Sequence, residues 1–438
     1  PFSIRLPSAL FVGAAVVAVV LIADRLSTRT VAIVAGVICC VLPRVTYMGE
    51  EARSFACSAA IAAWLTFLLI EVLRRPHPPL LLWLAYGLLL TLGMYVFLYL
   101  VLFVPVHALI LARARASRPV MRGWLVTCAG ALLLAGPLFV LAFLERAQIS
   151  YLRDDSEAGF TTLTVGLWFG GVWFAVVAWG LIGVALGVRM RRGILTRRGR
   201  PTARIPYRAD VPTAPSLEFV AACWLVVPTA LLLLLQLVFA GFTARYSSYS
   251  APAAAVLMAS GLVWIARNRR RRILVGAALV VALAIPIYLA QRGPYAKNDS
   301  DWAAISAVLQ QNTTPGDAVV FDETVRPSRR PRLAMHTYPA GFVGLRDVAL
   351  SRAAVDNNTW YDRAYPIETA ITLGRLDGSD RVWLIDYFSP GTVDSYGVGA
   401  LTSLGFTATL QFRTHRSVII LYSRSPGAES PAQARPAG

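Results

Sequence analysis

Charged side chains are scarce in this sequence. Only 15% of its 438 residues are Asp, Glu, Lys or Arg, whereas 56% are hydrophobic and the mean hydropathy is +0.58. Because soluble proteins carry about 25% charged residues, this composition excludes an ordinary soluble enzyme and indicates a polytopic membrane protein. Lysine is nearly missing as well: Lys297 stands alone, so the net charge of +18 comes from arginine.

Several chemical motifs are absent too. The five cysteines lie inside apolar runs, with neither metal-ligand spacing nor a plausible disulfide framework, and the four histidines are scattered. The sequence has no glycine-rich phosphate loop and no Ser/His/Asp arrangement. These absences direct attention to charged residues in the linkers between apolar runs.

Ten apolar runs have about the length that crosses a bilayer. They cover residues 8–24, 29–44, 54–74, 80–95, 97–114, 122–144, 165–187, 217–240, 249–267 and 272–290. The stretch from 80 to 114 is too long for one span, so it is divided at Leu92–Met94. The predicted fold class is a polytopic α-helical membrane domain over residues 1–290, followed by a small C-terminal α/β domain.

The arginines form short clusters in alternate linkers, which positive-inside topology explains better than nucleic-acid binding. The Arg-rich linkers, expected in the cytoplasm, are 24–29, 74–79, 113–122, 189–212 and 267–272. The linkers expected outside are 44–54, 92–97, 145–164 and 241–248, together with Pro1 and everything after Ala290. The sequence thus predicts a multi-pass plasma-membrane protein whose C-terminal domain is extracytoplasmic and which has no nucleic-acid partner.

The composition changes after Gln291, where Asp, Asn, Gly and Pro become frequent and apolar runs shorten to strand length. Ser300 is the expected N-cap of a helix over 301–311. Further expected elements are a turn at 314–317, strands at 318–321, 381–386, 407–412 and 417–422, and a helix at 395–404. These elements predict an α/β domain over 291–424, and residues 425–438 are expected to be a disordered tail.

The first candidate site is the stretch Pro43–Phe55, which places Glu50, Glu51 and Arg53 between two apolar runs. A charge facing hydrocarbon costs roughly 2.5–3.5 kcal/mol, so such residues usually face an interior or a wet cavity. If the following helix begins at residue 50, Glu50 and Arg53 share one face and Glu51 turns away by about 100°. An ordinary solvated loop remains the alternative.

Two further outward linkers hold candidate residues. Arg245 with Tyr246 and Tyr249 offers a planar donor and two phenols for a phosphate, although the same residues also serve as interfacial anchors. Asp154 and Asp155 offer an acidic contact for a cation or sugar, and simple solvation is the alternative there. In the C-terminal domain, Asp322, Glu323 and Asp386 follow or end predicted strands, where a structural role is expected.

These residues resemble a known family. Pro1–Leu10, at the start of a span, resembles the second membrane helix of polyprenyl-phosphate-dependent glycosyltransferases, which are GT-C fold, family 39-like enzymes related to protein mannosyltransferases and aminoarabinose transferases. Tyr47–Phe55 resembles their outward Glu-x-Arg stretch, with Glu51 and Arg53 as the matching pair. Arg245-Tyr246 followed by Pro252 resembles their late element at the lipid-phosphate side, and the C-terminal domain resembles that of actinobacterial members.

The resemblance implies transfer of a mannose- or arabinose-like sugar from a polyprenyl-phosphate donor to a glycan, lipid or protein acceptor on the outer face. Arg245 would hold the donor phosphate, and Glu51 with Arg53 would position the donor sugar or a divalent metal such as Mg or Mn, whose use is left open. In that family the principal catalytic Asp lies in the loop before the second span, so the base is expected upstream of Pro1 and this chain alone is expected to be inactive. A transporter or flippase, and a non-catalytic scaffold of envelope biosynthesis, are the alternatives.

Overall fold

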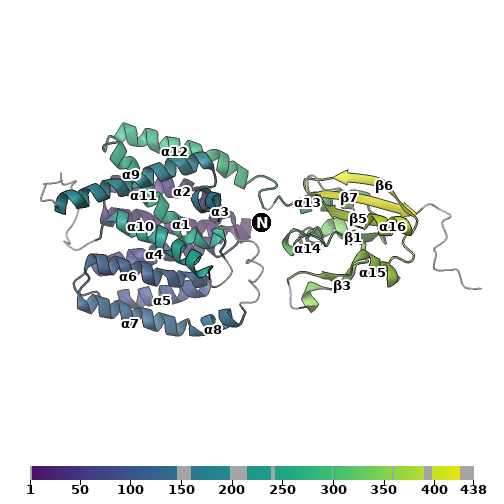
Figure 1. Cartoon of the computed structure of the whole chain (residues 1–438), viewed down its shortest axis with the longest axis horizontal. Coiled ribbons are helices and arrows are strands. Elements are labelled where there is room, and N and C mark those ends of the chain that lie inside the picture. Colours follow the sequence, from purple (N-terminus) through teal and green to yellow (C-terminus); the bar gives the residue numbers. More distant parts are fainter. Residues whose placement is uncertain are drawn as a thin grey trace, which may run out of the picture. The chain divides into compact units, whose positions relative to one another are not determined.

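The computed structural model describes residues 2–145, 159–197, 215–237, 242–297, 299–357, 360–388 and 397–424 (Figure 1). The chain divides into two compact units, Pro1–Gln291 and Arg292–Gly438, and each is treated by itself below. The predicted tail and the candidate pair Asp154 and Asp155 lie outside the described residues.

The first unit is built from helices. They are α1 (Phe2–Leu26), α2 (Arg29–Val41), α3 (Pro43–Glu50), α4 (Phe55–Leu73), α5 (Leu80–Val96), η1 (Leu98–Leu102), α6 (Phe103–Ala114), α7 (Arg118–Leu134), α8 (Gly136–Leu144), η3 (Thr162–Gly166), α9 (Val172–Arg197), α10 (Leu217–Leu235), η4 (Ala244–Ser250), α11 (Ala251–Ile265) and α12 (Arg270–Gln291).

Six helices of the described residues are long and apolar enough to span a membrane, or up to eight if α2 with α3 and α7 with α8 each make one bent span. The sequence predicted ten spans. The difference arises from α5 and from η1 with α6, which form separate apolar helices as expected but have no more than 17 residues each, which is short for a span. The class of protein is confirmed: the chain is a polytopic helical membrane protein.

Proline explains the bend of 55° between α2 and α3. Leu42 is extended, with φ −60° and ψ 124°, because the ring of the following Pro43 disfavours a helical conformation of the residue before it. Pro43 then fits the first turn of α3, where a missing N–H costs nothing. The predicted span 29–44 therefore becomes two helices.

The linkers meet at two separate ends of this unit. The Ser8 hydroxyl donates to the Glu51 carbonyl oxygen at 2.6 Å, whereas Arg25 Nε lies 2.8 Å from Glu71 Oε1. Because α1 rises about 1.5 Å per residue, these two contacts are about 26 Å apart along the helix. The Arg-rich linkers 24–29 and 74–79 thus lie at one end of the unit, and the stretch that holds Glu50, Glu51 and Arg53 lies at the other. The side of the membrane that each end faces stays a prediction.

The centre of the unit is α11, whose residues Ala251–Met258 are all buried. Small side chains allow its neighbours to approach closely: a Cβ added to Gly261 would lie 2.0 Å from the Leu181 carbonyl oxygen of α9. Such small-residue contacts are a common means of packing helices in membranes.

The second unit is an α/β domain. Its elements are α13 (Trp302–Asn312), β1 (Ala318–Phe321), η5 (Pro327–Arg329), α14 (Leu333–Thr337), η6 (Pro339–Phe342), β2 (Arg346–Asp347), β3 (Leu350–Arg352), η7 (Ala354–Asp356), β4 (Arg363–Ala364), α15 (Ile367–Thr372), β5 (Arg381–Tyr387), α16 (Val398–Ser403), β6 (Phe406–Arg413) and β7 (Ser417–Arg424). The four strands predicted from sequence correspond to β1, β5, β6 and β7.

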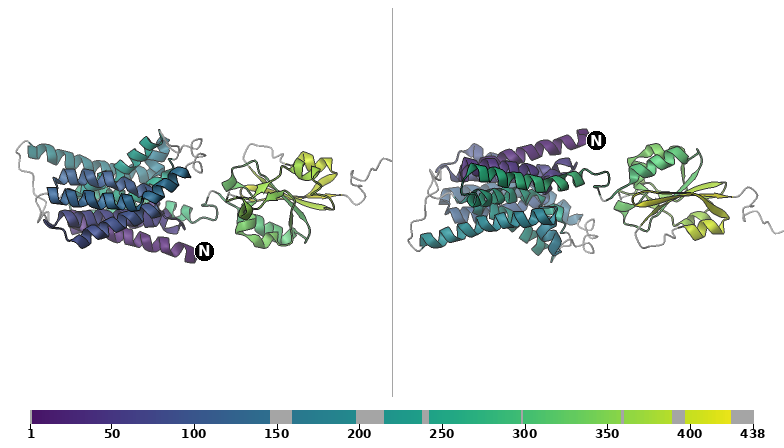
Figure 2. Two further views of the ribbon diagram at one scale, coloured as in Figure 1. Left: turned by 90° about the horizontal axis from the view of Figure 1, so that it is seen from below. Right: turned by 90° about the horizontal axis from the view of Figure 1, so that it is seen from above.

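The main sheet has the strand order β2-β1-β5-β7-β6, in which β1 pairs in parallel with β2 and β5, and β7 is antiparallel to β5 and β6. Helices cover both faces (Figure 2). Alternation along β5 explains this: Val382 and Leu384 join one core, with α15, whereas Trp383 and Ile385 join the other, with α13. The second unit is therefore a three-layer arrangement.

One predicted cap is wrong. The helix α13 begins at Trp302, and the residue at its N-cap is Asp301 rather than Ser300. The Asp301 carboxylate does not cap the helix but accepts hydrogen bonds from the Thr414 hydroxyl at 2.5 Å and the Arg416 backbone N–H at 2.7 Å. It therefore ties α13 to the β6–β7 turn.

Candidate functional site

The stretch with three charges is not helical in the way the sequence suggested. Glu50 ends α3, residues 51–54 form a bend, and α4 starts only at Phe55. Glu51 is extended, with φ −87° and ψ 130°. The expectation that Glu50 and Arg53 share a helix face is therefore wrong, because the helix ends between them. Instead, Glu51 is buried with 7% of its surface exposed, and Arg53 is exposed.

Residues from distant parts of the first unit hold α3 in place. Arg44 donates from Nε to the Leu167 carbonyl oxygen at 2.6 Å and from Nη2 to the Gly166 carbonyl oxygen at 2.5 Å. Gln291, at the end of α12, accepts from the Thr46 hydroxyl at 2.8 Å and donates to the Pro43 carbonyl oxygen at 2.9 Å. These bonds fix the helix that leads to Glu51.

The second candidate stretch lies near this bend. Phe55, next to Ser54, packs its ring 6.0 Å from that of Phe97, which lies 5.9 Å from the ring of Tyr246. Arg245 donates from Nε to the Thr243 hydroxyl at 3.1 Å, and its guanidinium carbon lies 5.9 Å from the centre of the Tyr246 ring. The aromatic contacts thus join Phe55, which directly follows the bend at residues 51–54, to the short helix η4 that carries Arg245 and Tyr246.

Tyr249 differs from the expectation of an accessible phenol offered to a phosphate. Its side chain is 0% exposed, and its hydroxyl donates to the Tyr99 carbonyl oxygen at 3.4 Å. Its own carbonyl oxygen accepts from Trp224 Nε1 at 3.0 Å. Burial on this scale makes Tyr249 a packing residue that holds η4, because the outward turn expected from sequence is instead a 3₁₀ helix packed on α4 and α10.

Sequence reasoning missed three serines of η4. Ser247, Ser248 and Ser250 are at most 1% exposed, and within the described ranges their hydroxyls have no hydrogen-bond partner. A buried hydroxyl without a partner is unfavourable, so it is uncommon in native structures. The only available signal was the high serine content next to Arg245.

The carboxylates do not form a metal site in the described part of the chain. No group of three or more His, Cys, Asp and Glu side chains there is arranged to hold a metal ion. We therefore assign no step to a divalent metal.

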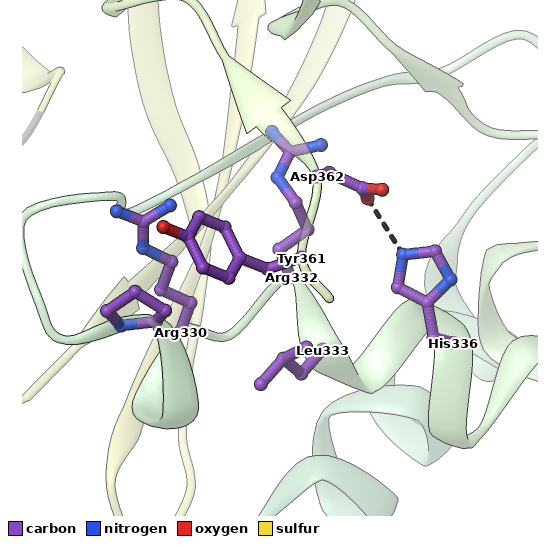
Figure 3. Close-up of a pocket in the computed structure, with 7 residues that line it drawn as sticks. Arg330, Arg332, Leu333, His336, Tyr361 and Asp362 are labelled. Atoms are coloured by element: carbon purple, nitrogen blue, oxygen red, sulfur yellow. Dashed lines mark hydrogen bonds and ion pairs between the residues drawn. The ribbon is translucent and has the colours of Figure 1, made fainter. Parts of the chain in front are cut away.

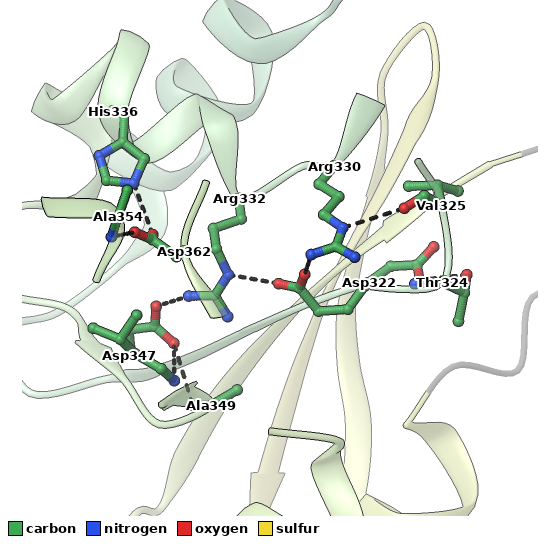
Figure 4. Close-up of polar contacts among 12 residues, drawn as sticks. Asp322, Thr324, Val325, Arg330, Arg332, His336, Asp347, Ala349, Ala354 and Asp362 are labelled. Carbon is green, nitrogen blue, oxygen red and sulfur yellow. Dashed lines mark hydrogen bonds and ion pairs between the residues drawn. The ribbon is translucent and has the colours of Figure 1, made fainter. Parts of the chain in front are cut away.

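The second unit holds a polar cluster that sequence reasoning also missed (Figure 4). Arg332 is 2% exposed; its Nε lies 2.5 Å from Glu323 Oε1, and its Nη1 forms an ion pair with Asp347. Burial opposes the charge of Arg332, but the carboxylates of Asp347 and Glu323 raise its pKa above the ordinary value. Arg330 shares Glu323, with Nη1 at 2.6 Å from Oε2.

The predicted acidic residues at the strand ends have separate surroundings. Asp322 follows β1 and accepts from the Thr324 N–H at 2.7 Å and hydroxyl at 2.6 Å. Asp386, near the end of β5, is 1% exposed. Glu323 holds the two arginines, so a structural role fits Asp322 and Glu323.

The fold of the chain is similar to that of solved structures at low sequence identity. No protein-family model and no curated protein matches the sequence. Among solved structures, the chain is similar to ArnT from Cupriavidus metallidurans in the apo state, with a TM-score of 0.54 and 12% identity over 95% of this chain and 83% of that chain. The same values hold for ArnT bound to undecaprenyl phosphate. A third structure is an oligosaccharyltransferase from Archaeoglobus fulgidus in complex with Zn and sulfate. It covers 96% of this chain and 61% of its own chain at 10% identity, and its TM-score of 0.46 is too low to support an inference.

The likeness to ArnT establishes the fold alone, because the identity is low. The chain is a polytopic helical membrane protein of the GT-C-like class, with a C-terminal α/β unit.

Proposed function

We propose that this chain is a membrane glycosyltransferase. It moves a mannose- or arabinose-like sugar from a polyprenyl-phosphate donor to a glycan, lipid or protein acceptor of the cell envelope, on the outer face of the plasma membrane. The proposal is supported by the GT-C-like fold and by the binding of undecaprenyl phosphate to ArnT, a protein with a similar fold. The observation that carries it is the burial of Glu51 in a non-helical bend next to η4.

Arg245 suits a phosphate at this place. Its Nε is held by Thr243, which orients the planar group, and a guanidinium engages two oxygens of a phosphate at once. In the transfer step it would stabilise the negative charge that develops on the leaving phosphate. Tyr246 lies beside it as a second contact.

Glu51 suits the donor sugar. A buried carboxylate accepts hydrogen bonds from sugar hydroxyls strongly, because little water competes there. Arg53, which is exposed two residues further on, would contact the donor phosphate or the sugar. Glu50 is half-buried and is assigned to substrate binding with Tyr246, while Tyr249 would act by holding η4. Asp154 and Asp155 stay predicted substrate contacts.

Binding of the donor tests the proposal, because it depends neither on the acceptor nor on the general base. The protein in lipid nanodiscs is titrated with undecaprenyl phosphate and with an undecaprenyl-phosphate sugar. We expect Arg245→Ala to weaken both ligands about 10- to 100-fold, since a hydrogen bond to a charged group contributes about 1.5–3 kcal/mol. Glu51→Gln should weaken only the sugar-bearing ligand.

The matched control is Arg122→Ala, which removes an exposed arginine from a linker expected on the cytoplasmic side. It should bind both ligands as the unmodified chain does. Binding of undecaprenyl phosphate that is equally strong in Arg245→Ala and in the control contradicts the phosphate role. Equal loss of both ligands in Glu51→Gln contradicts the sugar role.

A further inference from the structure

The loop that joins β3 to β4 in the second unit carries two exposed apolar side chains. It covers residues 353–362, and within it Val355 exposes 92% of its surface and Trp360 exposes 63%. Single exposed apolar residues are common on protein surfaces, whereas several on one surface indicate a partner.

Asn357 closes this loop across its base. Its Nδ2 donates to the Ala353 carbonyl oxygen at 2.8 Å and to the Tyr361 carbonyl oxygen at 3.3 Å. Because one nitrogen atom contacts both oxygens, the two legs of the loop lie side by side.

Asp362 holds the same loop against α14 (Figure 3). Its Oδ1 accepts from the Ala354 N–H at 2.8 Å, and its Oδ2 lies 2.7 Å from His336 Nε2 of α14. Val355 and Trp360 come directly beyond the two bonded legs, so they lie at the same end of a loop whose base is fixed.

Two arginines lie opposite each other where the chain enters and leaves the loop. Arg352 of β3 and Arg363 of β4 are cross-strand partners, and both are exposed. Neither side chain has a hydrogen bond or an ion pair with the residues that the structure describes. Like charges directly opposite each other are destabilising, so an anionic partner at this place is favourable. The exposed Asp356 of the loop offsets one of these charges and leaves an excess of positive charge.

A membrane surface is within reach of this loop. Residues 292–301 connect the second unit to α12, a helix long and apolar enough to span a membrane. A segment of this length spans roughly 35 Å even when it is fully extended. The tether therefore holds the second unit close to the bilayer, and a weak attraction is enough to dock it there.

The side chains of this surface suit lipid headgroups. Tryptophan is enriched at membrane–water interfaces, where its ring lies among the headgroups and its N–H stays in contact with polar atoms. Arginine binds phosphate with paired donors. A free phosphate ion would use Arg352 and Arg363 but not the apolar Val355 and Trp360, whereas a phospholipid surface uses all four.

We infer that the β3–β4 loop docks the second unit on a bilayer that contains anionic phospholipid. Val355 and Trp360 enter the headgroup layer, and Arg352 and Arg363 bind lipid phosphates. The inference concerns only the second unit, so it holds or fails independently of the transferase activity.

Photo-crosslinking on the full chain in lipid nanodiscs tests the inference. A p-benzoylphenylalanine label replaces Val355, and in nanodiscs of phosphatidylcholine with added phosphatidylglycerol it should form a phospholipid adduct that mass spectrometry detects. The matched control places the same label at Leu410, an exposed apolar residue of β6 at the opposite edge of the sheet from β2, and should give no lipid adduct.

The contribution of charge is measured with the label kept at position 355. Replacing both arginines, by Arg352→Gln and Arg363→Gln, should lower the adduct yield roughly threefold or more, since each arginine near an anionic surface contributes about fivefold. Trp360→Ser should also lower the yield, because the interfacial ring is lost. Hydrogen exchange of β1 and β5 checks that each variant is folded.

Three results in folded protein overturn the inference. The label at position 355 forms no lipid adduct, or crosslinks only to protein. Its lipid adduct is no more abundant than that of the label at Leu410. The yield is the same without phosphatidylglycerol and in the double arginine variant.

Discussion

The sharpest stability prediction concerns the buried arginine of the second unit. We expect Arg332→Met to destabilise that unit strongly. Methionine retains an unbranched apolar stem over Phe321, whose ring centre lies 4.8 Å from the guanidinium carbon, but it removes the charge that faces Glu323 and Asp347.

The magnitude follows from the two carboxylates that remain. Removing one partner of a buried ion pair costs about 3–5 kcal/mol. The lower end applies here, because Glu323 keeps Arg330 at 2.6 Å whereas Asp347, with 7% of its side chain exposed, loses its ion pair. For a unit of roughly 130 residues, a loss of about 3 kcal/mol lowers Tm by about 11 °C.

Hydrogen–deuterium exchange of the full chain in nanodiscs measures this loss directly. Amides of β1 and β5 that exchange through unfolding of the unit should exchange about 150-fold faster in Arg332→Met. The control Arg329→Met removes an exposed arginine from η5 and should leave the rates unchanged. Adding Asp347→Asn to Arg332→Met should restore part of the protection. If Arg332→Met exchanges like the control, the ion pairs do not stabilise the unit and the reasoning is refuted.

Two further predictions test other contacts. Burial raises the pKa of the Asp317 carboxyl. Hydrogen bonds donated by Thr314 and Trp383 and the nearby charge of Arg381 outweigh this effect, so the pKa lies below its ordinary value. The ionised carboxylate therefore stabilises the unit at every pH above the ordinary Asp pKa of about 4, and this contribution is lost as pH falls through the lower pKa of the folded state. Asp317→Asn should lower the stability of the unit at neutral pH and should reduce the loss of stability at acid pH, as measured by hydrogen exchange at a series of pH values. Gly261→Ala should lower the thermal stability of the first unit by about 1–3 kcal/mol or more, because the added Cβ would meet the Leu181 carbonyl oxygen. The control Gly130→Ala should not, since nothing lies within 4 Å of its added Cβ. Equal Tm values for the two variants would contradict the close packing of α9 on α11.

The helices and strands were largely predictable because each depends on a local pattern. Within the described residues, each predicted apolar run is mainly helical, as one helix or as two in succession, since backbone groups in hydrocarbon must be bonded within the segment. The strands around Val319 and Trp383 are short apolar runs bounded by turn residues, a pattern that needs no distant partner.

The site could be predicted only in part, because its geometry depends on distant residues. The sequence proposes Glu51 and Arg245 as site residues, and this stays a prediction. It did not predict the break that separates Glu50 from Arg53, which depends on where a short helix after Pro43 ends. Arg332 was missed for a related reason: its partners Glu323 and Asp347 lie 9 and 15 residues away, on segments that only the sheet brings together. Ion pairs between such segments leave no periodic pattern in the sequence.

The contacts of α3 and of the bend at residues 51–54 show whether this segment is a solvated loop. A solvated loop needs no partners, because water satisfies its backbone groups. Here the Glu51 carbonyl oxygen accepts from Ser8 of α1, and the Pro43 carbonyl oxygen accepts from Gln291 of α12. Non-helical backbone in a membrane protein is tolerated where protein buries it or where it lines a wet cavity. Because two helices distant in sequence supply these bonds and Glu51 is buried beside them, the segment is packed against the protein and is not a solvated loop.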